Sequence, residues 1–91
     1  MVNFEMKIAD VFHLNSGQTI FAGSVTGIEK LINNTKAQLI IDNREQQIIE
    51  IQGEMLMDRR HPLNHRAIST TDIIDITSDL VKKHECRLVE I

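Results

Sequence analysis

The chain has 91 residues, of which 42% are hydrophobic and 25% are charged, so residues 1–91 are expected to form a single globular domain around one core. The formal net charge of −3 argues against a general polyanion binder, because affinity for nucleic-acid phosphates depends on a basic surface. Three phenylalanines, with no tryptophan or tyrosine, also disfavour binding by stacking on nucleobases.

The chain carries no signal for secretion or for membrane insertion. Cys86 is the only cysteine, so no intramolecular disulfide can form. The first residues, MVNFEMKIAD, do not have the charged-then-apolar pattern of a leader, and no apolar run approaches the roughly 20 residues needed to cross a bilayer. We therefore expect a soluble, cytoplasmic protein.

The first third of the chain has the pattern of a β-hairpin. Apolar and polar residues alternate over NFEMKIADVFHL (3–14), as in a strand with one face in water. The turn NSG (15–17) offers a glycine for a positive-φ position, and QTIFAGSVT (18–26) is the returning strand. The small residues around Gly23 predict a place where another backbone or a bulky side chain comes close, as at the bend of a small barrel.

Asp10 interrupts the apolar face of the first predicted strand. Continued alternation places its carboxylate on the inner side, where an unpaired acid is costly. Either the strand contains a bulge at this point, or the carboxylate accepts hydrogen bonds from backbone N–H groups inside the fold. Both alternatives give Asp10 a structural role, which we prefer to a catalytic one.

The middle of the chain predicts a second hairpin. GIEKLINNT (27–35) is a connection that has the spacing of one amphipathic helical turn. Two strand-like runs rich in β-branched residues then surround Asp42 and Asn43, residue types that tolerate turn conformations. In the second run, alternate residues from Ile49 to Met57 fall on one face, which we expect to be the core.

The last third predicts two more strands and a short helix. AISTTDIIDIT (67–77) has a strand pattern, SDLVKKHE (78–85) is a turn or short helix capped by the hydroxyl of Ser78, and CRLVEI (86–91) is the final strand. Closely spaced strands without a long helix indicate a closed antiparallel barrel. The predicted fold is therefore all-β: a small six-stranded antiparallel barrel with Greek-key-like connections.

The stretch DVFHLNSGQTIFAGSVTG (10–27) resembles the start of the second domain of translational GTPases such as elongation factor Tu. The matching positions follow that family's order of an acid-led strand, a glycine-bearing turn, a threonine-led strand and a Gly-x-Val step: Asp10, Val11, Phe12, Gly17, Thr19, Gly23, Val25 and Gly27. AQLIID (37–42) and IQGEM (51–55) continue the likeness. The resemblance implies that family's recognition and scaffold barrel.

GTP binding in the same family belongs to a separate domain. Its phosphate loop is rich in glycine, ends in Gly-Lys-Ser or Gly-Lys-Thr, and holds phosphates through backbone N–H groups. This sequence contains no such loop. We therefore expect the chain neither to bind nor to hydrolyse GTP.

The loop DRRHPLNHR (58–66) is the strongest candidate for a binding site. Arg59, Arg60 and Arg66 place three guanidiniums on one irregular segment, a set suited to gripping a phosphate or a carboxylate on a partner. The alternative is a solvated loop whose arginines pair with Asp58 and with other acids of this acidic chain.

A different class of function would use His61, His65, His84 and Cys86, as a small metal-binding protein or an enzyme. His61 and His65 have the spacing of a helical metal site, but Pro62 argues against a helix there. His84 and Cys86 would share one face of an extended segment, yet their spacing matches no standard zinc pattern. Burial in the core is the simpler interpretation of Cys86.

These observations favour a non-enzymatic binding or scaffold module that needs no cofactor and no metal. We expect its partner to be a protein, with RNA or the ribosome as the second candidate, and we expect no binding to DNA, membranes or GTP. A 91-residue barrel filled by aliphatic side chains leaves little room for a catalytic pocket, which argues against the enzyme alternative.

Overall fold

The computed structural model describes residues 4–27, 32–55 and 65–91. Its strands are β1 (Glu5–His13), β2 (Thr19–Thr26), β3 (Asn33–Ile41), β4 (Arg44–Met55), β5 (His65–Thr70) and β6 (Cys86–Glu90), and its helix is α1 (Ser78–Lys83). The strands pair antiparallel throughout and close into a barrel in the order β1-β2-β5-β4-β3-β6. The predicted all-β, six-stranded barrel is therefore confirmed.

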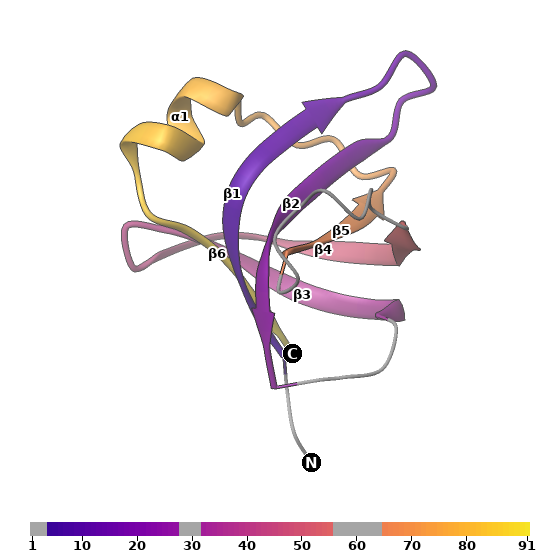
Figure 1. The fold of residues 1–91 in the computed structure, drawn as a ribbon, viewed down its shortest axis with the longest axis horizontal. Helices are drawn as coiled ribbons and strands as arrows, with labels where there is room; N and C mark the ends of the chain where they lie inside the picture. Colours follow the sequence, from indigo (N-terminus) through magenta and orange to yellow (C-terminus); the bar gives the residue numbers. More distant parts are fainter. Residues whose placement is uncertain (1–3, 28–31, 56–64) are drawn as a thin grey trace.

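Neighbouring strands of the barrel are often far apart in the sequence. β2 pairs with β5 and β3 with β6, while β6 closes the barrel against β1. Such long connections between antiparallel neighbours are the mark of Greek-key folds. Figure 1 shows the β1–β2 hairpin crossing the β3–β4 hairpin at a steep angle, with α1 beside β1.

A β-bulge at Ala9 resolves the problem of Asp10. Ile8 lies opposite Gly23 and Asp10 lies opposite Ala22, so Ala9 is an extra residue in β1. The extra residue shifts the alternation of the strand, which turns Asp10 away from the core and lets Val11 point into it. The Asp10 carboxylate also accepts a hydrogen bond from the backbone N–H of Val11, at 2.9 Å.

Gly23 lies where two backbones approach most closely. A Cβ atom at this position would be 1.9 Å from the carbonyl oxygen of Lys7 and 3.0 Å from the backbone nitrogen of Ala9. No side chain fits in that space, so only glycine allows β2 to lie this close to the bulged strand. The expectation of a tight approach at the small-residue run is confirmed.

Both predicted hairpin turns are present. The N–H of Leu14 donates to the carbonyl of Gln18 across the first turn, where Gly17 has φ 93°. In the second turn Asp42 and Asn43 have φ values of 50° and 65°, the left-handed pair that a two-residue type I′ turn requires. Ile41 pairs with Arg44 and Ile40 with Glu45 next to this turn, and a bulge at Gln46 then shifts the register of β4 by one residue.

β5 ends at Thr70, so the strand predicted over 67–77 is too long. The Thr70 hydroxyl donates to the carbonyl of Glu50 at 2.7 Å and accepts from the N–H of Asp72 at 3.1 Å. The Asp72 carboxylate in turn accepts the N–H of Glu50 at 2.8 Å. The side chains of Thr70 and Asp72 thus bond the carbonyl and N–H of Glu50 in β4, in place of the backbone of a longer β5.

The helix α1 is capped by Thr77 and not, as predicted, by Ser78. The Thr77 hydroxyl accepts the N–H of Leu80 at 3.2 Å, which satisfies one of the free donors of the first turn. Ser78 instead donates to the Asp10 carboxylate at 2.6 Å and ties α1 to β1. α1 has six residues, and no helix in the described part of the chain has the length and apolarity needed to cross a lipid bilayer.

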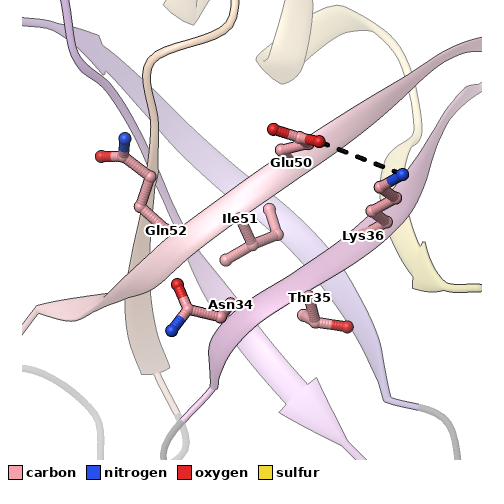
Figure 2. A pocket seen from close by; sticks show the side chains of 6 residues that line it. All are labelled: Asn34, Thr35, Lys36, Glu50, Ile51 and Gln52. Atoms are coloured by element: carbon pink, nitrogen blue, oxygen red, sulfur yellow. Dashed lines mark ion pairs between the residues drawn. The ribbon is translucent and has the colours of Figure 1, made fainter.

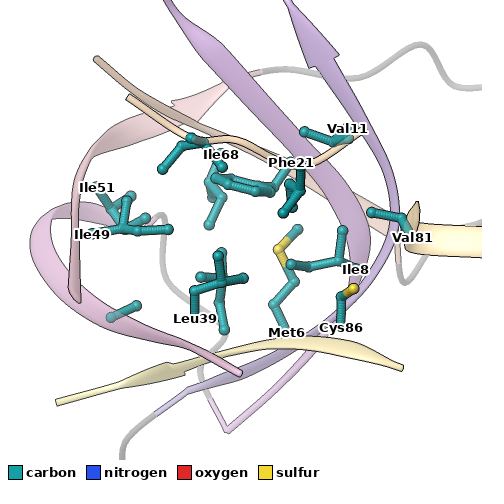
Figure 3. Close-up of a cluster of buried hydrophobic side chains, with 14 of the residues drawn as sticks. Met6, Ile8, Val11, Phe21, Leu39, Ile49, Ile51, Ile68, Val81 and Cys86 are labelled. Carbon is teal, nitrogen blue, oxygen red and sulfur yellow. The ribbon is translucent and has the colours of Figure 1, made fainter. Parts of the chain in front are cut away.

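The barrel interior is filled by aliphatic and aromatic side chains from every strand, as Figure 3 shows. The bulkiest fully buried members include Phe4 and Phe21, and Val81 contributes from α1. Ile74 and Ile76, in the irregular segment after β5, are also buried. They alternate with polar residues because they pack against the core, although this segment is not paired as a strand. The same alternation led the sequence to predict a strand here.

Candidate binding surfaces

The structure describes one of the three arginines predicted to bind an anion. Arg59 and Arg60 lie outside the described residues. Arg66 is in β5, and its Nε donates to Oε2 of Glu54 in β4 at 2.7 Å, while its Nη2 donates to Oε1 of the same carboxylate. The two side chains are 16% and 9% exposed, so this bidentate pair is largely removed from water.

The Arg66–Glu54 pair has a structural role between β4 and β5. Burial disfavours the ionised carboxylate of Glu54, but hydrogen bonds from Arg66 and from the N–H of Ile32 outweigh burial and lower its pKa. The carboxylate also raises the pKa of Arg66. Both groups are therefore charged at neutral pH, and an anion-binding role for Arg66 stays a prediction.

The structure describes the side chains of two of the four residues of the metal or enzyme alternative, His84 and Cys86. His61 and the side chain of His65 lie outside the described residues. His84 is exposed at the end of α1, whereas Cys86 is 3% exposed and belongs to the core. Burial raises the pKa of the Cys86 thiol, with a further contribution from the charge of Asp42. Within residues 4–27, 32–55 and 65–91, no group of three histidine, cysteine or acidic residues could hold a metal ion.

One surface depression lies over the outer face of the β3–β4 hairpin, and we call it the strand-face depression. Figure 2 shows its lining: Asn34, Thr35 and Lys36 from β3, and Glu50, Ile51 and Gln52 from β4. It has a volume of about 350 Å³. Lys36 and Glu50 face each other at 4.0 Å, and both are well exposed, so their ion pair adds little stability.

A second depression lies where the β3–β4 turn meets α1, and we call it the turn depression. It has a volume of about 450 Å³ and is lined by Ile41, Asp42, Arg44, Gln46, Leu80 and His84. Ile41 and Leu80 are half-buried and pack against the core, so they present the rest of their apolar surface to the depression. The turn depression therefore combines an aliphatic part with charged groups.

Asp42 organises this second depression. Its Oδ2 lies 2.6 Å from Nδ1 of His84, and its Oδ1 accepts the N–H of Glu85 at 3.0 Å. The hydrogen bond from His84, followed by that from Glu85, lowers the pKa of the Asp42 carboxyl. The backbone N–H of Asp42 also donates to the carbonyl of Glu85 at 2.8 Å. These contacts fix the β3–β4 turn to the segment between α1 and β6.

The sequence contained no signal for the turn depression. Asp42 and His84 are 42 residues apart, and each has an adequate local explanation, one in a turn and the other at a helix end. Arg44 follows the turn as an ordinary surface residue would. Only the pairing of β3 with β6 brings the two segments together.

Large apolar side chains also lie exposed on the described surface. Phe12 and Leu14 are exposed near the first hairpin turn, Ile48 on β4, and Ile73 in the segment after β5. Ile73 is 92% exposed, the most of this group. Single exposed apolar residues are common on soluble proteins, so they do not define a site individually.

No protein-family model, curated protein or solved structure matches this chain. Its function must therefore be inferred from the chemistry of the surfaces described above. Both depressions offer charged and amide side chains, and the turn depression adds the half-buried aliphatic Ile41 and Leu80.

Proposed function

We propose that this chain is a non-enzymatic binding module that acts in the cytoplasm and recognises a protein partner. The observation that carries the proposal is the contrast between the filled barrel and its surface. Core side chains occupy the interior, whereas the strand-face and turn depressions are on the outside, and the turn depression combines polar with aliphatic groups. Such surfaces suit contact with a partner better than enclosure of a substrate.

The chemistry of the turn depression supports binding over catalysis. Asp42 and His84 form the acid–histidine pair that orients the base in many hydrolases. A nucleophile must lie within hydrogen-bond reach of that histidine, and the described lining of the depression includes no serine, threonine or cysteine. Here the pair fixes a turn in place.

A protein is favoured over RNA as the partner. The net charge of −3 and the lack of tryptophan and tyrosine weaken both the electrostatic and the stacking contributions to RNA binding. The resemblance of residues 10–27 to the second domain of translational GTPases supports a recognition role without GTP chemistry. RNA remains the second candidate because of Arg59 and Arg60.

Affinity purification with a nuclease arm tests the proposal. The tagged chain is incubated with cell extract, treated or not with ribonuclease, and the retained material is identified by mass spectrometry and by sequencing. We expect a stoichiometric protein that is retained after ribonuclease treatment. Retention of RNA alone, or calorimetric detection of micromolar GTP binding, would contradict the proposal.

The arginine loop is tested separately by replacing Arg59 and Arg60 with serine while keeping Arg66, because Arg66 pairs with the largely buried Glu54. The matched control replaces the exposed Lys7 of β1 and Lys36 of β3 with serine, which removes the same charge elsewhere. If the loop binds an anionic partner, only the first variant loses affinity, and the loss shrinks as salt is added. Equal behaviour of the two variants would show that net charge alone matters.

A further inference from the structure

Arg44 offers hydrogen-bond donors to the turn depression that the described protein does not use, and His84 adds one when its imidazole is protonated. No hydrogen bond or ion pair to the Arg44 guanidinium occurs within the described ranges, although Arg44 is close enough to Asp42 to help lower the pKa of its carboxyl. His84 contacts Asp42 through Nδ1, and its Nε2 donates when both ring nitrogens carry a proton. A guanidinium and a protonated imidazole at one depression are suited to binding a carboxylate.

The carboxylate of Asp42 does not bond the Arg44 guanidinium or Nε2 of His84. One of its carboxylate oxygens contacts His84 Nδ1 and the other accepts the N–H of Glu85, so both are engaged toward the α1–β6 connection. Lys82 and Lys83, in the last turn of α1, are not part of the lining of the depression. The Arg44 guanidinium is therefore the charged group that the lining offers to an anion.

The aliphatic part of the depression indicates which kind of ligand carries the anionic group. Ile41 and Leu80 present apolar surface beside the two donors. A ligand that covers both parts has a carboxylate next to a branched aliphatic side chain. The volume of about 450 Å³ accommodates side chains of this size.

We propose that the turn depression binds an acidic–aliphatic segment of the protein partner, with the carboxylate on Arg44 and His84 and the aliphatic side chain on Ile41 and Leu80. This inference rests on the proposed function, since it names the chemistry that the partner presents. Charge complementarity and the adjacent apolar surface carry it.

Binding of blocked tetrapeptides, followed by amide chemical shifts in NMR, tests the chemistry directly. The probe has glutamate followed by leucine between two glycines; one control replaces the glutamate with glutamine and another replaces the leucine with glycine. We expect the probe to shift the amides of Asp42, Arg44 and Leu80, and each control to bind less tightly, by about tenfold for glutamine, the usual size for loss of a charged hydrogen bond. Equal shifts with sodium acetate would indicate a free small anion and overturn the proposal.

The second part of the test measures binding of the same peptide to variants of the protein. Arg44→Gln removes the free guanidinium, and Lys36→Gln removes one positive charge from the strand-face depression on the same hairpin. We expect Arg44→Gln to weaken peptide binding about tenfold and Lys36→Gln to leave it unchanged. Equal affinities of the two variants would overturn the assignment of the carboxylate to Arg44.

The same variants separate this inference from the proposed function. If Arg44→Gln abolishes retention of the protein partner from extract and Lys36→Gln does not, both stand. If Arg44→Gln retains the partner as well as the parent chain does, the depression is not the docking site, although the chain is still a binding module. If the parent chain retains no protein, the proposed function fails whatever the peptides do.

Discussion

At the scale of single residues, the closest packing constraint among the described glycines is at Gly23. The atoms that a Cβ would meet belong to the backbone of β1, at Lys7 and Ala9, and backbone cannot move aside as the end of a flexible side chain can. The bulge at Ala9 and the glycine at position 23 therefore depend on each other. A change at either position would disturb the pairing of β1 with β2.

We expect Gly23→Ala to lower the free energy of unfolding by about 1 to 3 kcal/mol, because the added methyl group forces β1 and β2 apart. Urea denaturation measures the change. Gly53→Ala is the control: a Cβ there would lie 3.5 Å from Oδ1 of Asn33, an ordinary contact, so its stability should stay near that of the parent. Equal stability of Gly23→Ala and the parent would mean that the two strands are not this close.

Cys86 gives a second prediction at this scale, since burial raises the pKa of its thiol and the thiolate is the reactive form. A thiol-specific chromogenic reagent should react slowly with the native chain. In about 8 M urea, which unfolds most proteins, it should react quickly and modify one thiol per chain. Rapid reaction under native conditions would show an activated cysteine and would revive the enzyme or metal alternative.

At the scale of elements, side chains replace strand pairing between β4 and the segment after β5. Among the described residues, backbone pairing of β4 with β5 covers Gly53 to Met55. Beyond it, Thr70 and Asp72 make hydrogen bonds to the carbonyl and N–H of Glu50. This arrangement releases the chain from the sheet, so that Ile74 and Ile76 can pack into the core on the way to α1.

Thr70→Val tests this arrangement. Thr70 is fully buried, and valine has nearly the same shape but no hydroxyl, so the carbonyl of Glu50 and the N–H of Asp72 would each lose a partner. We expect a loss of about 1 to 3 kcal/mol in the free energy of unfolding. Thr71→Val is the matched control, because Thr71 is exposed and accepts only from the Gln52 amide; its effect should stay within about 0.5 kcal/mol. Equal losses in both variants would contradict this role of Thr70.

At the scale of the whole molecule, carboxylates fasten segments that are distant in the sequence. Asp10 joins β1 to α1 through Ser78, Asp42 joins the β3–β4 turn to the α1–β6 connection, and Glu54 joins β4 to β5 through Arg66. The pKa of each of these three carboxyls is lowered in the folded chain. For Asp10 the hydrogen bond from Ser78 is the largest cause. The barrel is thus held in part by groups that must stay ionised.

Stability should therefore fall in acid. A carboxyl with a depressed pKa in the folded state stabilises the fold above its unfolded pKa of about 4, and this contribution is lost as the pH falls through the folded value. We expect the urea midpoint to be constant between pH 7 and about 5 as far as these carboxyls are concerned and to decrease below about 4. Ser78→Ala should make the decrease smaller, since it removes the main cause of the Asp10 shift. An acid-independent midpoint would contradict the contribution of these three groups.

Part of the candidate surface could be predicted from the sequence. The rest could not, because it depends on contacts between separate strands. The cationic character of Arg66 could be seen in the sequence, but its partner Glu54 is on another strand, and the pairing of β4 with β5 decides that the two meet. The sequence singled out His84 only as a metal or catalytic candidate beside Cys86, and it did not single out Arg44, because Arg44 does not depart from its local pattern. A site built from the ends of separate elements leaves no spacing to detect.

The sequence by itself determined the features that depend on local conformation and on alternation. Asp42 and Asn43 tolerate positive φ, Gly17 supplies it, and the absence of a side chain at Gly23 allows close approach; these preferences belong to the residues wherever they occur. The alternation of apolar residues likewise identified most strands of the barrel and its core face. All of these signals act over a few residues of chain.

The tertiary structure decided every feature in which a residue had two competing partners. Thr77 and Ser78 can both cap a helix, but the hydroxyl of Ser78 donates to the carboxylate of Asp10, 68 residues away, and Thr77 is the cap. The positions of Ile74 and Ile76 suit both a strand and an irregular segment. The strand ends at Thr70, whose hydroxyl donates to the carbonyl of Glu50. In each case local preference allows both outcomes, and hydrogen bonds to distant segments, formed only when the barrel closes, select one of them.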